Sequence, residues 1–282
     1  MKYAIVISAS KTKFGPIVFR EDLENNIIKA KEIGYDGIEL SVKNPGAVNI
    51  KRVKKVLRTS CLDILTIGTG QIYFDEGLSF SDPDEAIREG AVKKTKEVID
   101  LANNFNSSVI IGLIRGKIDT TGNDFKTTME RAEERLCRCF EDCLRYSEKY
   151  ETKFLIEPIN RYETNIFNRL DEVDMFLKKY KDILDIERIG VLADTFHMNI
   201  EEPVIEESLH TYFNIIKHIH FADSNRWAPG FGHTDFKKIL KVLRNNKYDN
   251  FISFEIFPYP EPDISARKAL EFIKNMDFKS GV

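Results

Sequence analysis

The most regular feature of the chain is the alternation of short apolar runs with longer amphipathic stretches. The apolar runs are rich in β-branched and aromatic residues and end at polar or turn-forming residues, which is typical of strands buried on both faces. We expect strands at Tyr3–Ser8, Gly37–Val42, Asp63–Gly68, Ser108–Leu113, Phe154–Ile159, Ile189–Thr195, Ile216–Asp223 and Phe251–Phe257.

The stretches between these runs carry apolar residues at the spacing of a helix face. Helices are predicted at Leu23–Ile33, Pro83–Asn103, Thr127–Lys149, Asp171–Tyr180, Phe236–Asn246 and Ser265–Lys274. Strands that alternate with helices form right-handed βαβ units and a parallel sheet. Eight such units predict an α/β fold of the (β/α)8 TIM barrel type, which needs about 250 residues. We therefore expect residues 1–282 to form a single barrel domain.

Long irregular stretches are expected at Thr69–Asp82, Arg115–Asp124 and Asn225–His233. Each follows a predicted strand, and barrels of this kind carry their active sites on the loops at that end of the strands. The pattern places function on one rim of the barrel.

Composition narrows the class of protein. The net charge of −3, with 31% charged residues, gives no overall positive field for nucleic acid. No run of about 18 apolar residues predicts a membrane span, and the N-terminal run is too short for a signal peptide. The cytoplasm is the expected location. Cys137, Cys139 and Cys143 share a predicted helix without metal-ligand spacing, so they and Cys61 are expected to be free thiols.

Acidic residues and histidines occupy the ends of four successive predicted strands. Glu157 lies near the end of the fifth strand, Asp194 near the end of the sixth, His218 and His220 in the seventh, and Glu255 in the eighth. A carboxylate inside an apolar strand is costly unless it is paired or bound to a cation. Four neighbouring strands with this feature predict a divalent metal site at the rim, for which Mn²⁺, Mg²⁺, Co²⁺ and Zn²⁺ are all suitable ions.

The segments around these residues resemble a known family. IEPINRYETN, LADTFHMNIEE, HIHFADSNRWAPGFGHTDF and FEIF look like the sugar isomerase and epimerase family with the xylose isomerase-like barrel, and within it the ketose 3-epimerases typified by D-tagatose and D-psicose 3-epimerases. GYDGIELSV also matches the family's second strand, so the likeness covers essentially the whole chain.

The resemblance implies one divalent ion, with Mn²⁺ expected, bound by Glu157, Asp194, His220 and Glu255. It also implies that Glu157 and Glu255 act as acid and base on opposite faces of a keto sugar. Substrate contacts are expected from Glu163, His197 and Arg226, and the family suggests a homodimer or homotetramer. A proton beside a ketone can be removed only if the resulting cis-enediolate is stabilised, which a Lewis-acidic metal provides.

Two further residues are expected to contact the substrate. Arg115 follows the fourth strand together with Lys117, and an arginine there could bind a carboxylate through two parallel hydrogen bonds. IGTGQ, RG and SNRWAPG also resemble a subgroup that includes 5-keto-L-gluconate epimerases, so the substrate is expected to be a ketohexose or a keto-sugar acid. Gln71, after the third strand, could reach a sugar hydroxyl.

Other residues near the rim have structural interpretations as well. Glu39 could form an ion pair that faces the site, His218 could be a satisfied core histidine, and Asp223 could bond Arg226 or a loop amide. Other functions of the same scaffold also stay open. A lyase that acts on inososes or C-glycosides and an aldose–ketose isomerase both begin with proton removal beside a carbonyl. An apurinic endonuclease is disfavoured because it needs more rim histidines than the five in this chain and a basic surface.

Overall fold

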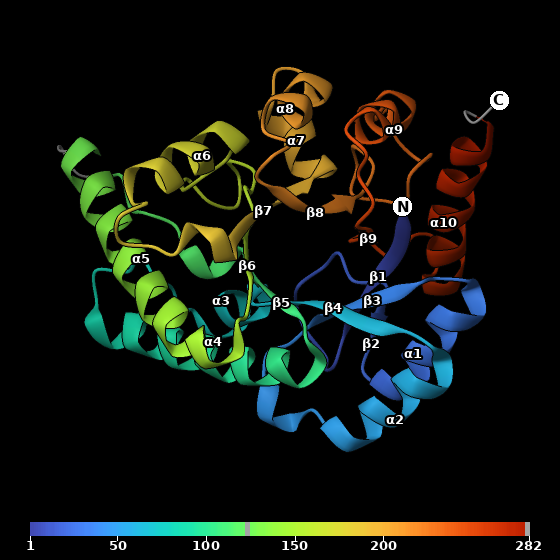
Figure 1. Ribbon diagram of the computed structural model, residues 1–282, viewed down its shortest axis with the longest axis horizontal. Helices are drawn as coiled ribbons and strands as arrows, with labels where there is room; N and C mark the ends of the chain where they lie inside the picture. The colour runs from blue at the N-terminus through green and yellow to red at the C-terminus, as the bar shows by residue number, and fades with distance from the viewer. Residues whose placement is uncertain (122–124, 280–282) are drawn as a thin grey trace.

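Parallel strands form the centre of the fold. The protein is described here by a computed structural model, which covers residues 1–121 and 125–279 (Figure 1). Over these residues the strands are β1 (Lys2–Ser8), β2 (Phe19–Arg20), β3 (Gly37–Ser41), β4 (Asp63–Gly68), β5 (Ser108–Ile111), β6 (Phe154–Ile156), β7 (Ile189–Asp194), β8 (Ile216–Phe221) and β9 (Phe251–Phe254). β1 and β3 to β9 pair in chain order, and β9 pairs back with β1, so the sheet closes into the (β/α)8 barrel expected from the sequence.

The closing pair of strands is held by register and by aromatic packing. Ile5 of β1 lies opposite Phe254 of β9, in a parallel ladder that runs back to Lys2 and Phe251. The fully buried ring of Phe254 contacts the rings of Tyr3, Tyr35 and Phe221. Burial of a Phe side chain contributes about 2 kcal/mol, so this cluster stabilises the seam between the first and the last strand.

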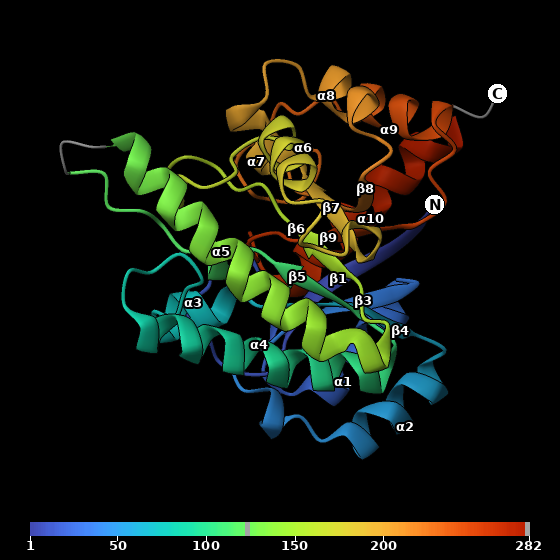
Figure 2. The ribbon, with the colours of Figure 1, turned by 60° about the vertical axis from the view of Figure 1, so that its left-hand side comes forward.

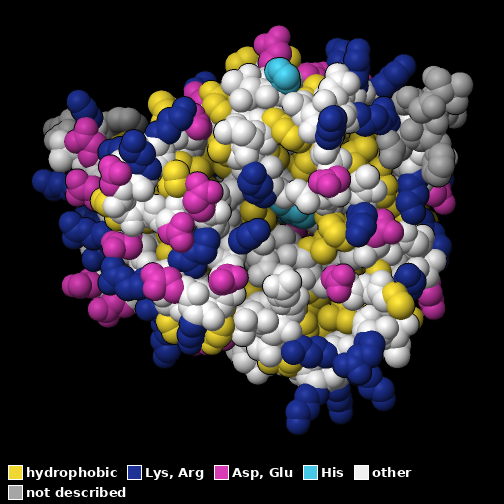
Figure 3. Space-filling view, viewed as in Figure 1, with side chains coloured by type: hydrophobic (Ala, Val, Ile, Leu, Met, Phe, Trp, Pro, Cys, Tyr) yellow, Lys and Arg dark blue, Asp and Glu magenta, His cyan; other side chains and the backbone are white. Residues whose placement is uncertain are grey.

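Helices cover the outside of the barrel (Figures 1 and 2). They are α1 (Leu23–Ile33), α2 (Ile50–Ser60), α3 (Gly70–Glu76), α4 (Glu85–Phe105), α5 (Phe125–Ser147), α6 (Leu170–Lys179), α7 (Thr195–Glu201), α8 (Ile205–Thr211), α9 (Phe236–Asn245) and α10 (Pro262–Lys279). The long helices α4 and α5 lie side by side on one flank. None of the helices in the described part of the chain has the length and apolar character needed to cross a bilayer. Figure 3 shows basic and acidic side chains interspersed over one face of the molecule.

The predicted elements agree with the structure except near the rim. The bounds of α1 and β4 coincide with the prediction, whereas β5, β6, β8 and β9 end two or three residues earlier than expected. They end where the chain turns from the sheet towards polar residues of the rim. The expected irregular stretch Thr69–Asp82 is wrong in part, because α3 forms within it. The sequence IYF in that stretch has no helical periodicity long enough to indicate a helix by itself.

The cysteines are free thiols, as expected. Cys61 is exposed, whereas Cys137, Cys139 and Cys143 are buried on α5. Burial raises the pKa of Cys137 and of Cys139 to about 11 and raises the pKa of Cys143 further. Only about 0.1% of a thiol with such a pKa is ionised at pH 8, and the thiolate is the reactive form.

We therefore expect Ellman's reagent at pH 8 to modify one thiol of the native protein rapidly, and all four only after denaturation. The variant Cys61→Ser should show no rapid phase. Rapid reaction of two or more thiols in the native protein would mean that α5 is packed less tightly than described.

Candidate functional site

The carboxyl ends of four neighbouring strands bring the predicted ligands together. Glu157 directly follows β6, Asp194 is the last residue of β7, His220 lies near the end of β8, and Glu255 directly follows β9. Asp194 and His220 are paired positions of adjacent strands. All four side chains are buried, and one ligand atom from each lies within 4.8 Å of those of the others.

Several atoms of this cluster have no hydrogen-bonding partner. Glu157 Oε1, Asp194 Oδ2 and His220 Nδ1 are buried and unpaired, although buried polar atoms in folded proteins are almost always bonded. His220 Nδ1 lies 3.4 Å from Asp194 Oδ2, 3.7 Å from Glu255 Oε2 and 3.8 Å from Glu157 Oε1. The unpaired atoms therefore converge on one shared centre.

Local structure explains why Asp194 presents only one oxygen to that centre. Asp194 is the N-cap of α7, and its Oδ1 accepts hydrogen bonds from the backbone N–H groups of Phe196 and His197. Capping occupies Oδ1 and fixes the carboxylate plane. Oδ2 is left to face the cluster.

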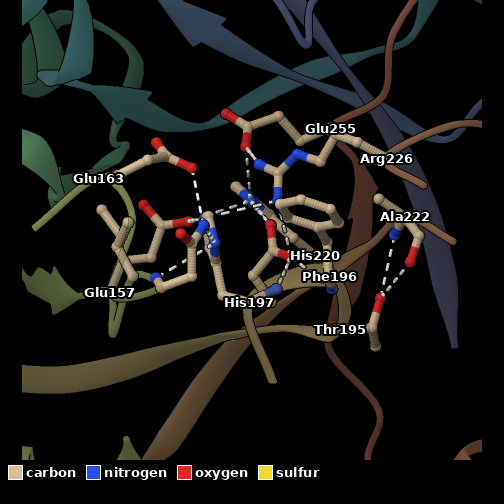
Figure 4. A network of polar contacts seen from close by, with 12 residues as sticks. Glu157, Glu163, Thr195, Phe196, His197, His220, Ala222, Arg226 and Glu255 are labelled. Atoms are coloured by element: carbon tan, nitrogen blue, oxygen red, sulfur yellow. Dashed lines mark hydrogen bonds and ion pairs between the residues drawn. The ribbon is translucent and has the colours of Figure 1, made fainter. Parts of the chain in front are cut away.

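Arg226 neutralises part of the acidic charge. Its guanidinium donates to Asp194 Oδ1 at 3.0 Å and to Glu255 Oε2 (Figure 4). Arg226 has a φ of 63°, in the left-handed region that costs energy for a residue other than glycine. The Asp223 carboxylate accepts backbone N–H groups of Ser224, Gly230 and Thr234, which confirms the loop-amide interpretation and holds the loop in this conformation.

Glu39 orients His220 from the other side. Glu39 Oε2 lies 3.0 Å from His220 Nε2 and 3.2 Å from His218 Nε2, and accepts the hydroxyl of Thr66 at 2.6 Å. Because Nε2 of His220 donates to this carboxylate, Nδ1 is free to offer its lone pair to the cluster. Glu39 thus pairs with histidines that face the site, as the sequence suggested, but through hydrogen bonds, and His218 is satisfied by Glu39 and Ser253.

Glu163 and His197 lie beside the cluster, as expected, and are joined by Asn160. The Asn160 amide donates to Glu163 Oε1 at 2.7 Å and lies 2.8 Å from His197 Nδ1, towards which its backbone N–H also points. His197 therefore carries its ring proton on Nε2. Asn160 was not identified from the sequence, although its place between Glu157 and Glu163 on the rim loop is the signal that could have indicated it.

Several of these residues line a cavity of about 260 Å³. Its polar part is formed by Glu39, Ser41, Glu157, Glu163, His197, His220, Arg226 and Glu255. Its apolar part includes Phe14, Pro16, Phe74, Leu113, Phe196 and Phe257. In Figure 4, Glu157 and Glu163 lie on one side of His197, and Arg226 and Glu255 lie on the other.

Burial and neighbouring charges set the protonation of the site. Burial, followed by the charge of Glu255, raises the pKa of Glu157 well above its usual value. Burial alone would raise the pKa of Asp194, but the charge of Arg226 holds it below its usual value. Burial lowers the pKa of His197 to about 3, so this imidazole is neutral at physiological pH. Glu157 and His197, two of these perturbed groups, line the cavity, and such clustering is typical of functional sites.

The structure contradicts the expected substrate contact of Arg115. The short 3₁₀ turn Leu113–Arg115 directs this side chain into the protein, where it is 1% exposed and does not line the cavity. Its guanidinium donates to the backbone carbonyls of Ile111 and Ile166 and packs over the ring of Phe167. Lys117 is exposed and donates to a loop carbonyl. Neither Arg115 nor Lys117 therefore supports the expectation of an acidic substrate.

Gln71 is also placed differently from the prediction. Its amide nitrogen donates to the hydroxyls of Ser8 and Ser41, and the side chain is fully buried. Ser41 lines the cavity, whereas Gln71 does not. Gln71 therefore supports the wall of the cavity, and its position gives no support to the expected contact with a sugar.

Comparison with known proteins identifies the family. Residues 27–276 match the family described as the xylose isomerase-like TIM barrel, and the chain belongs to this family. The sequence is 26% identical over 242 residues to the 3-dehydro-D-guloside 4-epimerase of Escherichia coli K12, covering 84% of this chain and 88% of that one. It is 27% identical over 242 residues to the D-psicose 3-epimerase of Ruminiclostridium cellulolyticum, covering 84% and 78%.

The fold also matches solved structures. The 3-keto-D-glucoside 4-epimerase of Escherichia coli superimposes with a TM-score of 0.79 at 21% identity, over 96% of this chain and 99% of that one. The D-psicose 3-epimerase of Clostridium cellulolyticum H10, crystallised with D-tagatose, gives 0.76 at 22% identity over 98% and 99%.

The contacts of Arg115 predict a structural role. In Arg115→Ala, buried carbonyls of Ile111 and Ile166 lose their donors, so the free energy of unfolding in urea should fall by about 3 kcal/mol. Lys117→Ala, the exposed control, should change it by less than about 0.5 kcal/mol. Full stability of Arg115→Ala, with activity lost only towards acidic ketoses, would restore the interpretation made from the sequence.

Proposed function

We propose that this protein is a divalent metal-dependent epimerase that inverts the carbon next to the ketone of a keto sugar. The observation that carries the proposal is the buried set of Glu157, Asp194, His220 and Glu255, whose ligand atoms converge while Glu157 Oε1, Asp194 Oδ2 and His220 Nδ1 lack any partner. The relatives described above are named as epimerases of keto sugars, which supports the reaction type.

The residues fit a divalent ion. Three carboxylates and one imidazole are a mixed oxygen and nitrogen donor set of the kind that Mn²⁺ and related ions accept. Arg226 offsets only part of the negative charge, and an added cation would satisfy the unpaired atoms without rearrangement of the strands. When bound, the metal would act as a Lewis acid that makes the proton beside the ketone more acidic. Mn²⁺ is the ion that we propose.

The side chains around the cluster have the positions needed to hold a sugar. His197 is neutral and presents its Nε2 proton at the cavity wall, where it can donate to a sugar oxygen. Arg226 is a fixed cation that can stabilise negative charge developing on an enediolate. Glu163, fixed by the amide of Asn160, can accept a hydroxyl of the substrate.

Glu157 and Glu255 are the acid–base pair of the proposal. They line one cavity from strands β6 and β9, which are not adjacent in the barrel. One carboxylate takes the proton from carbon, and the C–H electron pair moves into the carbonyl group to give the enediolate. The other carboxyl returns a proton to the opposite face, and the configuration of that carbon is inverted. In the metal-free protein the raised pKa of Glu157 favours its protonated form.

Deuterium exchange tests the reaction directly. We expect the Mn²⁺-loaded protein to incorporate solvent deuterium at the carbon beside the ketone of a ketohexose, with formation of its epimer, as measured by NMR in D₂O. Glu157→Gln and Glu255→Gln should each reduce exchange at least about 100-fold, because each removes a proton acceptor. EDTA should abolish exchange. An aldose product would identify an isomerase, loss of a hydroxyl or aglycone would identify a lyase, and no exchange with any ketone tested would contradict the proposal.

The contact between Glu39 and His220 predicts an effect on metal binding. In Glu39→Gln the charged acceptor that fixes the His220 tautomer is lost, so metal affinity should fall roughly 10- to 100-fold. Titration calorimetry with Mn²⁺, and the metal-dependent rise in melting temperature, measure this effect without use of activity. Ser253→Ala is the matched control, because it removes only a contact of His218. Equal affinities of Glu39→Gln and wild type would show that Glu39 does not position His220.

A further inference from the structure

The cavity has two chemically different parts. At its base, Glu157, Asp194, His220 and Glu255 are each buried to more than nine-tenths. At its opening, the aromatic side chains are exposed to solvent: Phe74 is 51% and Phe257 is 39% exposed, and Phe14 is half-buried. We call Phe14, Phe74 and Phe257 the aromatic rim.

The rim is built from three separate segments and is already in place without a ligand. Phe14 lies between β1 and β2, Phe74 lies on α3, and Phe257 follows β9. The rings of Phe14 and Phe74 meet edge to face with centroids 6.2 Å apart. Phe257 packs so closely on Gly15 that a Cβ atom added there would lie 2.3 Å from its ring. Phe14 and Phe74 hold each other in position and Phe257 is held against Gly15, so little side-chain entropy is lost when a ligand binds the rings.

The opening offers little to a charged or hydroxyl-rich group. Among the described residues that line the cavity, Arg226 is the sole lysine or arginine, and it is buried and paired with Asp194 and Glu255. Arg115, the other candidate cation, is committed to backbone carbonyls. The other apolar residues that line the cavity include Pro16 and Leu113, which are buried and offer no side-chain hydrogen bond. If the substrate carried a carboxylate or phosphate at the end that faces the opening, that group would lose hydration without gaining a hydrogen bond or an ion pair.

From this division we propose that the substrate is an uncharged keto sugar that carries an apolar substituent, as in a glycoside with an apolar aglycone. The keto ring occupies the polar base, and the aglycone packs against the aromatic rim. Burial of apolar surface on exposed aromatic rings favours this arrangement. The inference rests on the proposed epimerase function and specifies its substrate class.

Two substrates with the same reacting ring isolate the contribution of the rim. The methyl and phenyl glycosides of 3-keto-glucose differ only in the aglycone, and deuterium exchange with Mn²⁺-loaded protein gives kcat/KM for each. We expect the phenyl glycoside to be preferred roughly tenfold by the wild type, since its ring buries additional apolar area. In Phe74→Ala and in Phe257→Ala this preference should fall to about twofold or less.

Tyr162→Ala is the matched control, because Tyr162 is an exposed aromatic residue that does not line the cavity. Its preference should equal that of the wild type. Equal kcat/KM for the two glycosides in the wild type, or a preference retained in both rim variants, would overturn the inference. Exchange with free ketohexoses but with neither glycoside would overturn the inference and leave the epimerase function standing. Absence of exchange with every ketone would contradict the epimerase function itself and the inference with it.

Discussion

The burial of like charges is the constraint on which the rest of the structure depends. Glu157, Asp194 and Glu255 meet at the carboxyl ends of their strands, where the barrel excludes water, and Arg226 is the arginine that balances them directly. Isolated buried carboxylates are too costly to persist. The capping of α7, the left-handed backbone at Arg226 and the hydrogen bonds of Asp223 all serve to hold compensating groups against this cluster.

Much of this arrangement could be predicted from the sequence, because it follows from strand order. Apolar runs of the right length indicate the strands, and the polar residue that ends each run then has to lie on the common rim. Glu157, Asp194 and Glu255 could be grouped in this way with the pair His218 and His220, whereas the choice of His220 came from the family resemblance. Resemblance to ketose 3-epimerases added roles for His197, Glu163 and Arg226 as expectations, and the structure places all three at the cavity.

The sequence could not predict the directions in which side chains point beyond the ends of the strands. Arg115 lies on the rim in sequence, but a single 3₁₀ turn points its guanidinium away from the cavity. Gln71 was expected in an irregular segment, whereas its place on α3 turns it towards Ser8 and Ser41. The role of Asn160 as a bridge arises because it contacts both its near neighbour Glu163 and His197, which lies 37 residues further along the chain. Periodicity carries no information on such contacts.

The seam between β1 and β9 has a consequence for synthesis of the protein on the ribosome. Because Ile5 pairs with Phe254, this edge of the first strand stays open until residue 254 has been made. Glu255 directly follows this last strand, so the polar centre cannot be assembled in any shorter nascent chain. The partly made protein would expose an unpaired strand of the kind that promotes aggregation, and rapid capture of β9 once it emerges is therefore the step that protects the newly made chain.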